Sequence, residues 1–99
     1  MTVKIKIDVT GHPTRIVGCS TDGLEAIRLT FNPSLNDDVT TLKALAAAFI
    51  THCDTVTRRQ PWASRELAVA KTNMQTASMW SVLGATKTND DNQVEKANN

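Results

Sequence analysis

The chain has 99 residues, of which 40% are apolar, 21% charged and 4% aromatic, and its formal charge is +1. This length allows one small domain and excludes two full-sized ones, and the balanced charge gives no general attraction to nucleic acid or anionic lipid. The longest strongly apolar run, residues 44–50, is far shorter than the ~20 residues that span a bilayer. With no visible signal peptide and no CxxC pattern around Cys19 and Cys53, we expect a reduced, cytosolic protein.

The first third of the chain has the pattern of a small β-meander. Alternate residues from Val3 to Val9 are apolar, which is the period of a strand with one buried face. Gly11-His12-Pro13 breaks this run, and a short second strand is expected at residues 16–19. The turn Thr21-Asp22-Gly23 offers a glycine for a positive φ, and a third alternating strand is expected from Glu25 to Phe31.

A first helix is predicted after this β segment. Asn36 or Asp37 is a suitable N-cap, because its side chain can accept hydrogen bonds from the first free amides of the helix. Apolar residues then recur with the a/d spacing of a helix that packs against another, at positions 39, 42, 46, 49, 53 and 56. Three successive alanines, residues 46–48, favour a helix and allow a partner to approach closely.

A second helix is predicted from about Arg65 to Ala85, after a connector at residues 58–62 and with Ser64 as its N-cap. This helix is apolar on two sides. One side carries Ala63, Leu67, Ala70, Met74 and Ala77, and the other carries Val69, Thr76, Trp80 and Leu83. A helix of this kind usually contacts two partners. The first helix is one of them, in an αα-hairpin, and the sheet or a second subunit is the other.

Together these elements predict an α+β fold, with a small antiparallel three-stranded β-meander over residues 2–31 followed by a helical hairpin over residues 36–86. We expect residues 1–87 to form a single domain that oligomerises through the hairpin. A core this small supplies only a few kcal/mol of stability, and the second helix has an apolar side to spare. Residues 88–99 are polar and aperiodic, which predicts a disordered tail.

No pattern of a catalytic or metal site is present, so we expect neither an enzyme nor a cofactor. The adjacent residues His52 and Cys53 could be imagined as metal ligands together with Cys19. However, neighbouring side chains on a helix diverge by ~100°, and the same divergence argues against a Cys-His nucleophile pair. The glycines are scattered and form no phosphate-binding loop.

One group of candidate binding residues follows the third expected strand. Phe31 stands directly before Asn32-Pro33-Ser34 and a helix N-terminus. If exposed, Phe31 would stack on a planar base, Asn32 and Ser34 would offer hydrogen bonds, and the helix amides would attract an anion. The alternative is that Phe31 is the last core residue of its strand and that Asn-Pro-Ser is only a turn.

A second group, Arg58, Arg59 and Arg65, surrounds the hairpin connection. Guanidinium groups bind phosphate bidentately. In the alternative interpretation these arginines belong to a solvated loop, and Arg65 forms a surface charge pair with Glu66 that contributes little. Thr72 is by default an ordinary residue of the polar face.

The second helix also resembles a known family. Residues 65–82 read RELAVAKTNMQTASMWSV, and they are similar to the helical hairpin of two groups of phage anti-defence proteins, the anti-CBASS (Acb) and Thoeris anti-defence (Tad) sponges. In that hairpin an arginine opens the helix, small residues and a threonine follow, and an Ala/Ser-Met-Trp triplet closes it. Phe-Asn-Pro-Ser at residues 31–34, joined to such a hairpin, resembles the Tad branch with an N-terminal sheet. The resemblance spans roughly residues 24–86.

This resemblance implies a phage-encoded sponge that binds and sequesters cyclic nucleotide immune signals without cleaving them, in the cytoplasm of the infected bacterial host. The implied ligands are the cyclic ADP-ribose isomers of Thoeris, with the cyclic oligonucleotides of CBASS as a further class. Family members assemble as homo-oligomers, commonly hexamers, with ligand sites between subunits.

The resemblance also implies roles for single residues. Phe31 would stack on the adenine, and Asn32 and Ser34, on either side of Pro33, would hold its polar edge or the ribose. The pyrophosphate would be met by Arg65, with Arg58 or Arg59 as further candidates. Thr72 would add a hydroxyl, and Met79 and Trp80 would pack the hairpin.

A different class of function remains open as the alternative. A small oligomeric phage structural or regulatory hairpin protein would use the same apolar stripes to bind a protein partner. Neither a membrane nor DNA or RNA is an expected partner, because eleven basic residues balanced by ten acidic ones do not build a basic face.

Overall fold

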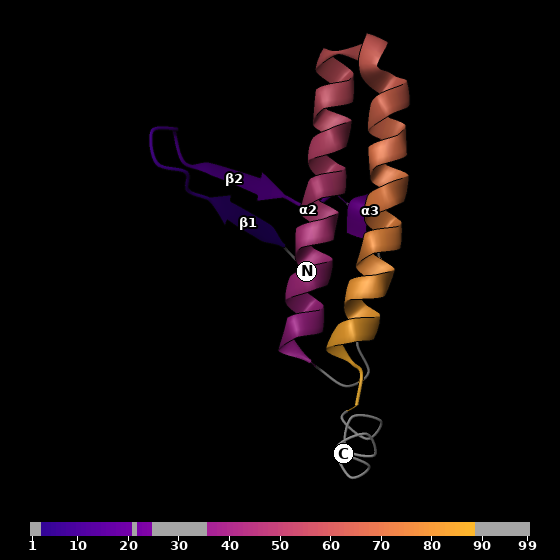
Figure 1. Cartoon of the computed structure of the whole chain (residues 1–99). Coiled ribbons are helices and arrows are strands. Elements are labelled where there is room, and N and C mark those ends of the chain that lie inside the picture. Colours follow the sequence, from indigo (N-terminus) through magenta and orange to yellow (C-terminus); the bar gives the residue numbers. More distant parts are fainter. Residues whose placement is uncertain (1–2, 21, 25–35, 89–99) are drawn as a thin grey trace.

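The computed structural model describes residues 3–20, 22–24 and 36–88. Its elements are the strands β1 (Lys4–Ile7) and β2 (Arg15–Gly18), the helix α2 (Asp37–Arg59), the short 3₁₀ helix η1 (Pro61–Ala63) and the helix α3 (Ser64–Ala85). The two long helices lie side by side as a hairpin, and the sheet projects from the flank of α2 (Figure 1). The expected α+β class with a helical hairpin is confirmed.

The sheet is antiparallel, and its two described strands are joined by residues 8–14, which contain a tight turn. Ile5 lies opposite Val17 and Ile7 opposite Arg15. In the turn the N–H of His12 donates to the carbonyl of Val9 at 3.0 Å. Gly11 has a φ of 86°, a conformation that glycine adopts without the steric cost of a side chain. The expected break after the first strand is confirmed. The third expected strand, Glu25–Phe31, lies outside the described residues.

Residues 22–24 form a helical turn, so the prediction that Asp22 and Gly23 belong to a hairpin turn is wrong. The amide of Leu24 donates to the carbonyl of Ser20 at 2.9 Å, and the amide of Gly23 donates to the Ser20 hydroxyl at 3.0 Å. Ser20 therefore acts as a helix cap, which a sequence search for hairpin turns overlooks. Its own amide donates to Thr51 Oγ1 at 2.9 Å, and this bond ties the turn to α2.

Gly23 allows the closest approach between this helical turn and α2. A Cβ atom at Gly23 would lie 2.8 Å from Thr51 Oγ1 and 3.0 Å from the backbone oxygen of Ala47. Among the described glycines only Gly11 has a positive φ. The glycine at position 23 is therefore needed for space, and not for the left-handed conformation that we expected from the sequence.

The change Gly23→Ala should lower the free energy of unfolding by ~1–3 kcal/mol, because the added methyl has to displace backbone of α2. Gly84→Ala is the matched control, since nothing lies within 4 Å of its Cβ. In the last turn of α3 the alanine should raise stability slightly, by at most the ~0.5–1 kcal/mol of a helix interior. Urea denaturation measures the change in the free energy of unfolding for each variant. Changes of the same sign would contradict the close approach of Gly23 to α2.

Asn36 is the N-cap of α2. Its side-chain oxygen accepts the amide N–H groups of Asp38 at 2.8 Å and Val39 at 3.2 Å. Asp37 and Asp38 stand in the first turn, where carboxylates favour the positive end of the helix dipole. Of the two caps that the sequence allowed, the structure selects Asn36.

The burial of α2 exceeds the a/d stripe, widened by Leu45 and Ile50, that the sequence predicts. Its buried residues are Val39, Lys43, Ala44, Ala46, Ala47, Ala48, Ile50 and Cys53. This wide buried surface arises because α3 packs against one side of α2, and the sheet and the helical turn pack against another. Phe49, at an expected core position, is 43% exposed, because it lies between these two contacts and neither covers it.

The start of α3 differs from the expectation. η1 runs directly into this helix, with the N–H of Ala63 donating to the carbonyl of Gln60 at 2.9 Å and the N–H of Ser64 donating to that of Pro61. Ser64 is therefore the first residue of α3, and it is not the N-cap that the sequence suggested. The preceding 3₁₀ turn gives these amides backbone acceptors, so no side-chain cap is required.

One side of α3 packs on α2 and the opposite side is uncovered in the single chain. Leu67 and Met74 are half-buried and Ser78 is buried, whereas Trp80 is 69% exposed and Met79 is 73% exposed. The packing role that the resemblance implied for Met79 and Trp80 is therefore wrong within one chain, because both side chains project away from α2. In the part of the chain that the structure describes, no helix is long and apolar enough to cross a membrane.

Candidate functional site

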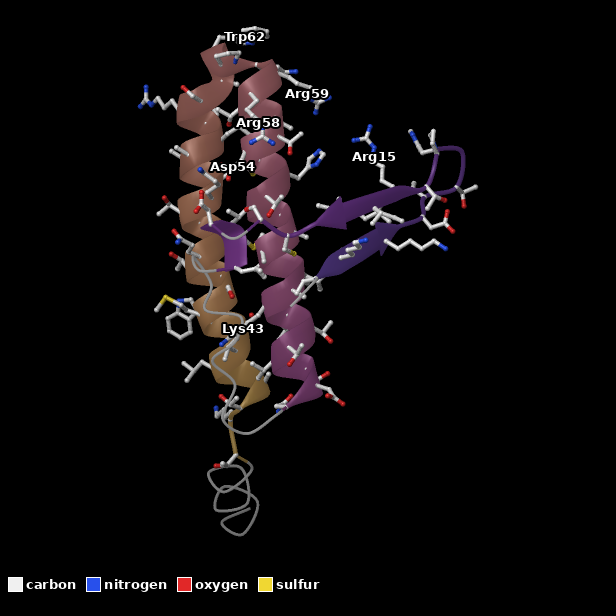
Figure 2. The ribbon with its side chains drawn as sticks, turned by 180° about the vertical axis from the view of Figure 1, so that it is seen from behind. Arg15, Lys43, Asp54, Arg58, Arg59 and Trp62 are labelled. Carbon is white, nitrogen blue, oxygen red and sulfur yellow. The ribbon has the colours of Figure 1, made fainter. Side chains whose placement is uncertain are left out.

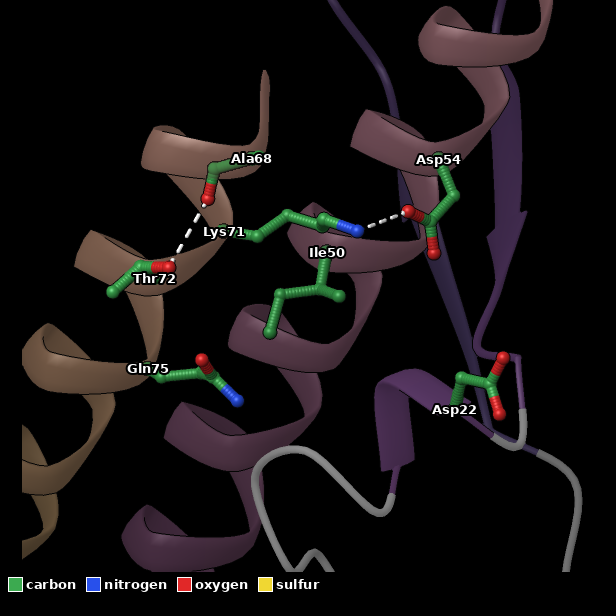
Figure 3. A pocket seen from close by; sticks show the side chains of 7 residues that line it. All are labelled: Asp22, Ile50, Asp54, Ala68, Lys71, Thr72 and Gln75. Carbon is green, nitrogen blue, oxygen red and sulfur yellow. Dashed lines mark hydrogen bonds and ion pairs between the residues drawn. The ribbon is translucent and has the colours of Figure 1, made fainter. Parts of the chain in front are cut away.

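A polar groove with a volume of about 520 Å³ lies between α2, α3 and the helical turn at residues 22–24. Its size falls within the range of small-molecule sites, roughly 300–1,000 Å³. Figure 3 shows its lining residues, which are Asp22, Ile50, Asp54, Ala68, Lys71, Thr72 and Gln75. We call this cavity the polar groove.

Helical periodicity brings these residues together. Ile50 and Asp54 are one turn apart on α2, and Ala68, Thr72 and Gln75 follow at the three- and four-residue spacing of one face of α3. Ile50 is only 4% exposed and forms the apolar floor of the groove. The walls are polar side chains that remain accessible to a ligand.

An ion pair crosses the groove from one helix to the other. The Lys71 ammonium lies 2.7 Å from Asp54 Oδ1 (Figure 3), and about a third of each side chain is exposed. A pair this accessible contributes ~0–1 kcal/mol to stability, because water and salt screen the attraction. Lys71 and Asp54 can therefore exchange partners with a ligand at little cost to the fold.

Thr72 presents its hydroxyl beside this pair. The hydroxyl donates to the carbonyl of Ala68 at 3.2 Å (Figure 3). A hydroxyl that donates in this way still has lone pairs that accept hydrogen bonds from a ligand. The structure therefore places Thr72, a binding candidate from the sequence, in the wall of the polar groove.

Arg58 and Arg65 do not line the groove itself and lie one helical turn beyond its lining residues, toward the hairpin tip. Arg58 comes one turn after Asp54 on α2, and Arg65 comes one turn before Ala68 on α3. Both are exposed, and Arg58 Nη2 donates to Thr55 Oγ1 at 3.2 Å. Figure 2 shows Arg58 near the tip, above Asp54.

Arg59 lies on a different side of α2. It follows His52 by seven residues and therefore shares the face of that residue. Figure 2 shows Arg59 on the side from which the sheet projects, where Arg15 also lies. The structure thus separates the three candidate arginines, with Arg58 and Arg65 at the polar groove and Arg59 away from it.

The other candidates from the sequence, Phe31, Asn32, Pro33 and Ser34, lie outside the described residues. Conversely, the reasoning from sequence missed Asp22, Asp54 and Gln75 as groove residues. A signal for the ion pair was present, because Asp54 and Lys71 carry opposite charges and lie at similar distances from the hairpin connection, five residues before the end of α2 and seven after the start of α3. Residues related in this way meet in an antiparallel helical hairpin.

The two cysteines are poor nucleophiles. Burial raises the pKa of the Cys19 thiol, and burial together with the nearby Asp54 carboxylate raises the pKa of Cys53, with Lys71 acting in the opposite direction. Both thiols therefore remain protonated at neutral pH, and the thiol form reacts slowly. Within the described ranges, no three His, Cys, Asp or Glu side chains gather as metal ligands would.

The comparison with protein families decides where this hairpin belongs. The family model described as the Acb2/Tad1 hairpin domain matches residues 22–86, about two thirds of the chain. The chain belongs to the Acb2/Tad1 hairpin family. The match confirms the resemblance of the sequence and includes every residue that lines the polar groove, whereas β1 and β2 precede the Acb2/Tad1 match. Searches of the curated proteins and of the solved structures gave no match.

Proposed function

We propose that this protein binds cyclic nucleotide signals of bacterial immunity in the polar groove and sequesters them without cleavage, thereby blocking host anti-phage defence. One observation carries the proposal. The segment that matches the Acb2/Tad1 hairpin family contains a groove of ligand size, lined by one lysine and two carboxylates, and Arg58 and Arg65 follow one helical turn beyond its lining residues.

The charge distribution of the groove suits the two kinds of groups that a cyclic nucleotide presents. Its phosphates require bidentate cationic donors, and Arg58 and Arg65 supply guanidinium groups at the tip end. Its ribose hydroxyls and base amino groups are donors, and the carboxylates of Asp22 and Asp54 accept such hydrogen bonds. Lys71, between the two ends, has an ammonium within reach of either a phosphate or Asp54.

The proposed ligands are cyclic ADP-ribose isomers, with CBASS cyclic oligonucleotides as a further class. In this proposal Phe31 stacks on the base, and Asn32 and Ser34 add hydrogen bonds to it or to the ribose. We propose sequestration and not hydrolysis. This part of the proposal is supported by the lining of the groove, in which none of the seven residues is a histidine or a cysteine.

The proposal is tested by incubating the purified chain with a panel of cyclic ADP-ribose isomers and cyclic oligonucleotides. A ligand that binds the folded state raises the melting temperature, and the rise grows with its concentration as RT ln(1 + [L]/Kd). Heating should then release the ligand chemically unchanged. A hydrolysed product would contradict sequestration. A panel without any binder, together with capture of a defined protein partner, would favour the structural or regulatory hairpin protein.

We further propose that subunits associate through the uncovered side of α3, most simply as a hexamer. Trp80 and Leu83 are exposed there together with Val69, and burial of apolar surface drives such association. The change Trp80→Glu should reduce the assembly to smaller species, because it places a charge in the apolar contact. Trp62→Glu is the matched control, since Trp62 is even more exposed than Trp80 but lies on η1 at the hairpin tip.

Native mass spectrometry and light scattering measure this effect. The wild-type chain and Trp62→Glu should give the same oligomeric mass, and Trp80→Glu a lower one. A wild-type chain that is monomeric at micromolar concentration would contradict the proposed association.

A further inference from the structure

A second cavity, independent of the polar groove, lies between the sheet and α2. Its volume is about 310 Å³. Its floor is apolar, and it is lined by Ile5, Ile7, Arg15, Val17, Leu45, Ala48, Phe49 and His52. It shares no lining residue with the polar groove. We call it the sheet pocket.

Arg15 occupies an unusual place in this pocket. Ile5 lies opposite Val17 and Ile7 opposite Arg15, and directly opposed residues of two strands point to the same face of a sheet. Arg15 therefore stands on the apolar face that turns toward α2. The adjacent Ile16 is 67% exposed on the outer face.

The guanidinium of Arg15 has no acidic partner in the described ranges. The ion pair found there joins Lys71 to Asp54 on the far side of α2. Figure 2 shows the Arg15 side chain standing clear of the sheet. A second guanidinium, that of Arg59, lies two turns beyond His52 on the same face of α2. The mouth of the sheet pocket is therefore cationic and its floor is hydrocarbon.

We infer that the sheet pocket binds a small amphipathic anion, whose hydrocarbon body fills the floor and whose carboxylate or phosphate head pairs with Arg15. A nucleobase would fit this pocket poorly, because only Arg15 and His52 among the lining residues have polar side chains, and most of its polar edge would be buried without hydrogen bonds. The volume is also near the lower limit of ligand sites, about 300 Å³. This inference does not depend on the function proposed for the polar groove.

Calorimetric titration of the full chain tests the inference with three probes that each carry a ten-carbon chain and differ in the charge of the head group, used below the concentrations at which they form micelles. Decanoate should bind, and the neutral decanol and the cationic decyltrimethylammonium should bind at least about tenfold more weakly. Neither of these two probes carries the anionic acceptor for a charge-assisted hydrogen bond from Arg15, which accounts for an affinity difference of this size. Decyl phosphate, titrated in parallel, shows whether the site prefers a carboxylate or a phosphate head.

Two exposed arginines provide matched variants. Arg15→Gln should weaken decanoate about tenfold or more and leave decanol unchanged, whereas Arg65→Gln, on α3 at the polar groove, should alter neither. Arg15→Glu should reverse the preference, so that decyltrimethylammonium binds more tightly than decanoate.

Three results would overturn the inference. Equal binding of decanoate and decanol would show that the pocket recognises hydrocarbon alone. Equal losses of affinity for decanoate in Arg15→Gln and Arg65→Gln would show that the overall charge of the chain, and not the sheet pocket, attracts the probe. Failure of decanoate to bind, with a lower oligomeric mass for Arg15→Gln, would show that a second copy of the chain covers this face.

Discussion

Replacing both Arg58 and Arg65 with alanine should abolish measurable binding of the cyclic nucleotide while leaving the hairpin folded. Each arginine can make a charge-assisted contact to phosphate that contributes ~1.5–3 kcal/mol. Both side chains are exposed, so their removal should change stability little. If the two contacts are independent, the double variant loses ~3–6 kcal/mol of binding free energy. Calorimetric titration against the ligand found in the panel measures this loss.

Arg59→Ala is the control that the structure supplies, because it removes the same charge from the next residue but from another face of α2. Its affinity should equal that of the wild-type chain. Arg65→Lys should recover only part of the loss of Arg65→Ala, since an ammonium cannot replace the bidentate guanidinium. An equal loss in Arg58→Ala and Arg59→Ala would indicate that bulk charge, and not placement at the polar groove, attracts the ligand.

Truncating Ile50 to alanine should have the largest effect on the fold, lowering the free energy of unfolding by ~2–5 kcal/mol. Ile50 is 4% exposed and belongs to the central cluster with Ala44, Ala46 and Ala47. Small neighbours cannot fill the space that its side chain leaves, so a cavity remains beneath the polar groove. Urea denaturation measures the loss.

Leu45→Ala is the matched control for Ile50→Ala. Leu45 is on the same helix, but it is 49% exposed, so its truncation removes less buried surface. Its cost should be well below that of Ile50→Ala. Equal losses in the free energy of unfolding for the two variants would show that the main packing partners of α2 lie outside the residues that the structure describes.

The sequence was sufficient to predict the approximate bounds of the helices. It was not sufficient to predict which face of each element turns toward the core. The start of α2 at Asn36 and the extent of α3 follow from a capping side chain and from helical periodicity, both of which are read over a few residues. The face of β2 depends on register instead. A one-residue difference decides whether Ile16 or Arg15 turns toward α2, and the turn after β1 decides it.

In the candidate site too, neighbouring residues in the sequence were easier to identify than the faces on which they lie. Sequence proximity grouped Arg58 with Arg59, but successive residues of a helix point ~100° apart, so the two arginines lie on different faces of α2. Arg65 was identified by the same proximity, the resemblance gave Arg65 and Thr72 their roles, and their common face with Ala68 follows from helical spacing. Asp22 could not be placed in advance, because its approach depends on the helical turn that Ser20 caps.

The arrangement of the helices also bears on how quickly each cavity forms. α2 and α3 contact each other extensively across a connection of only a few residues, and proteins dominated by such local contacts fold fast. All but one of the residues that line the polar groove belong to this hairpin. The sheet pocket instead requires β1 and β2 to dock on α2 across a longer stretch of chain. We expect the amides of α2 and α3 to be protected before those of β1 and β2 in pulse-labelled hydrogen exchange, so that most of the polar groove is assembled while the sheet pocket is still open.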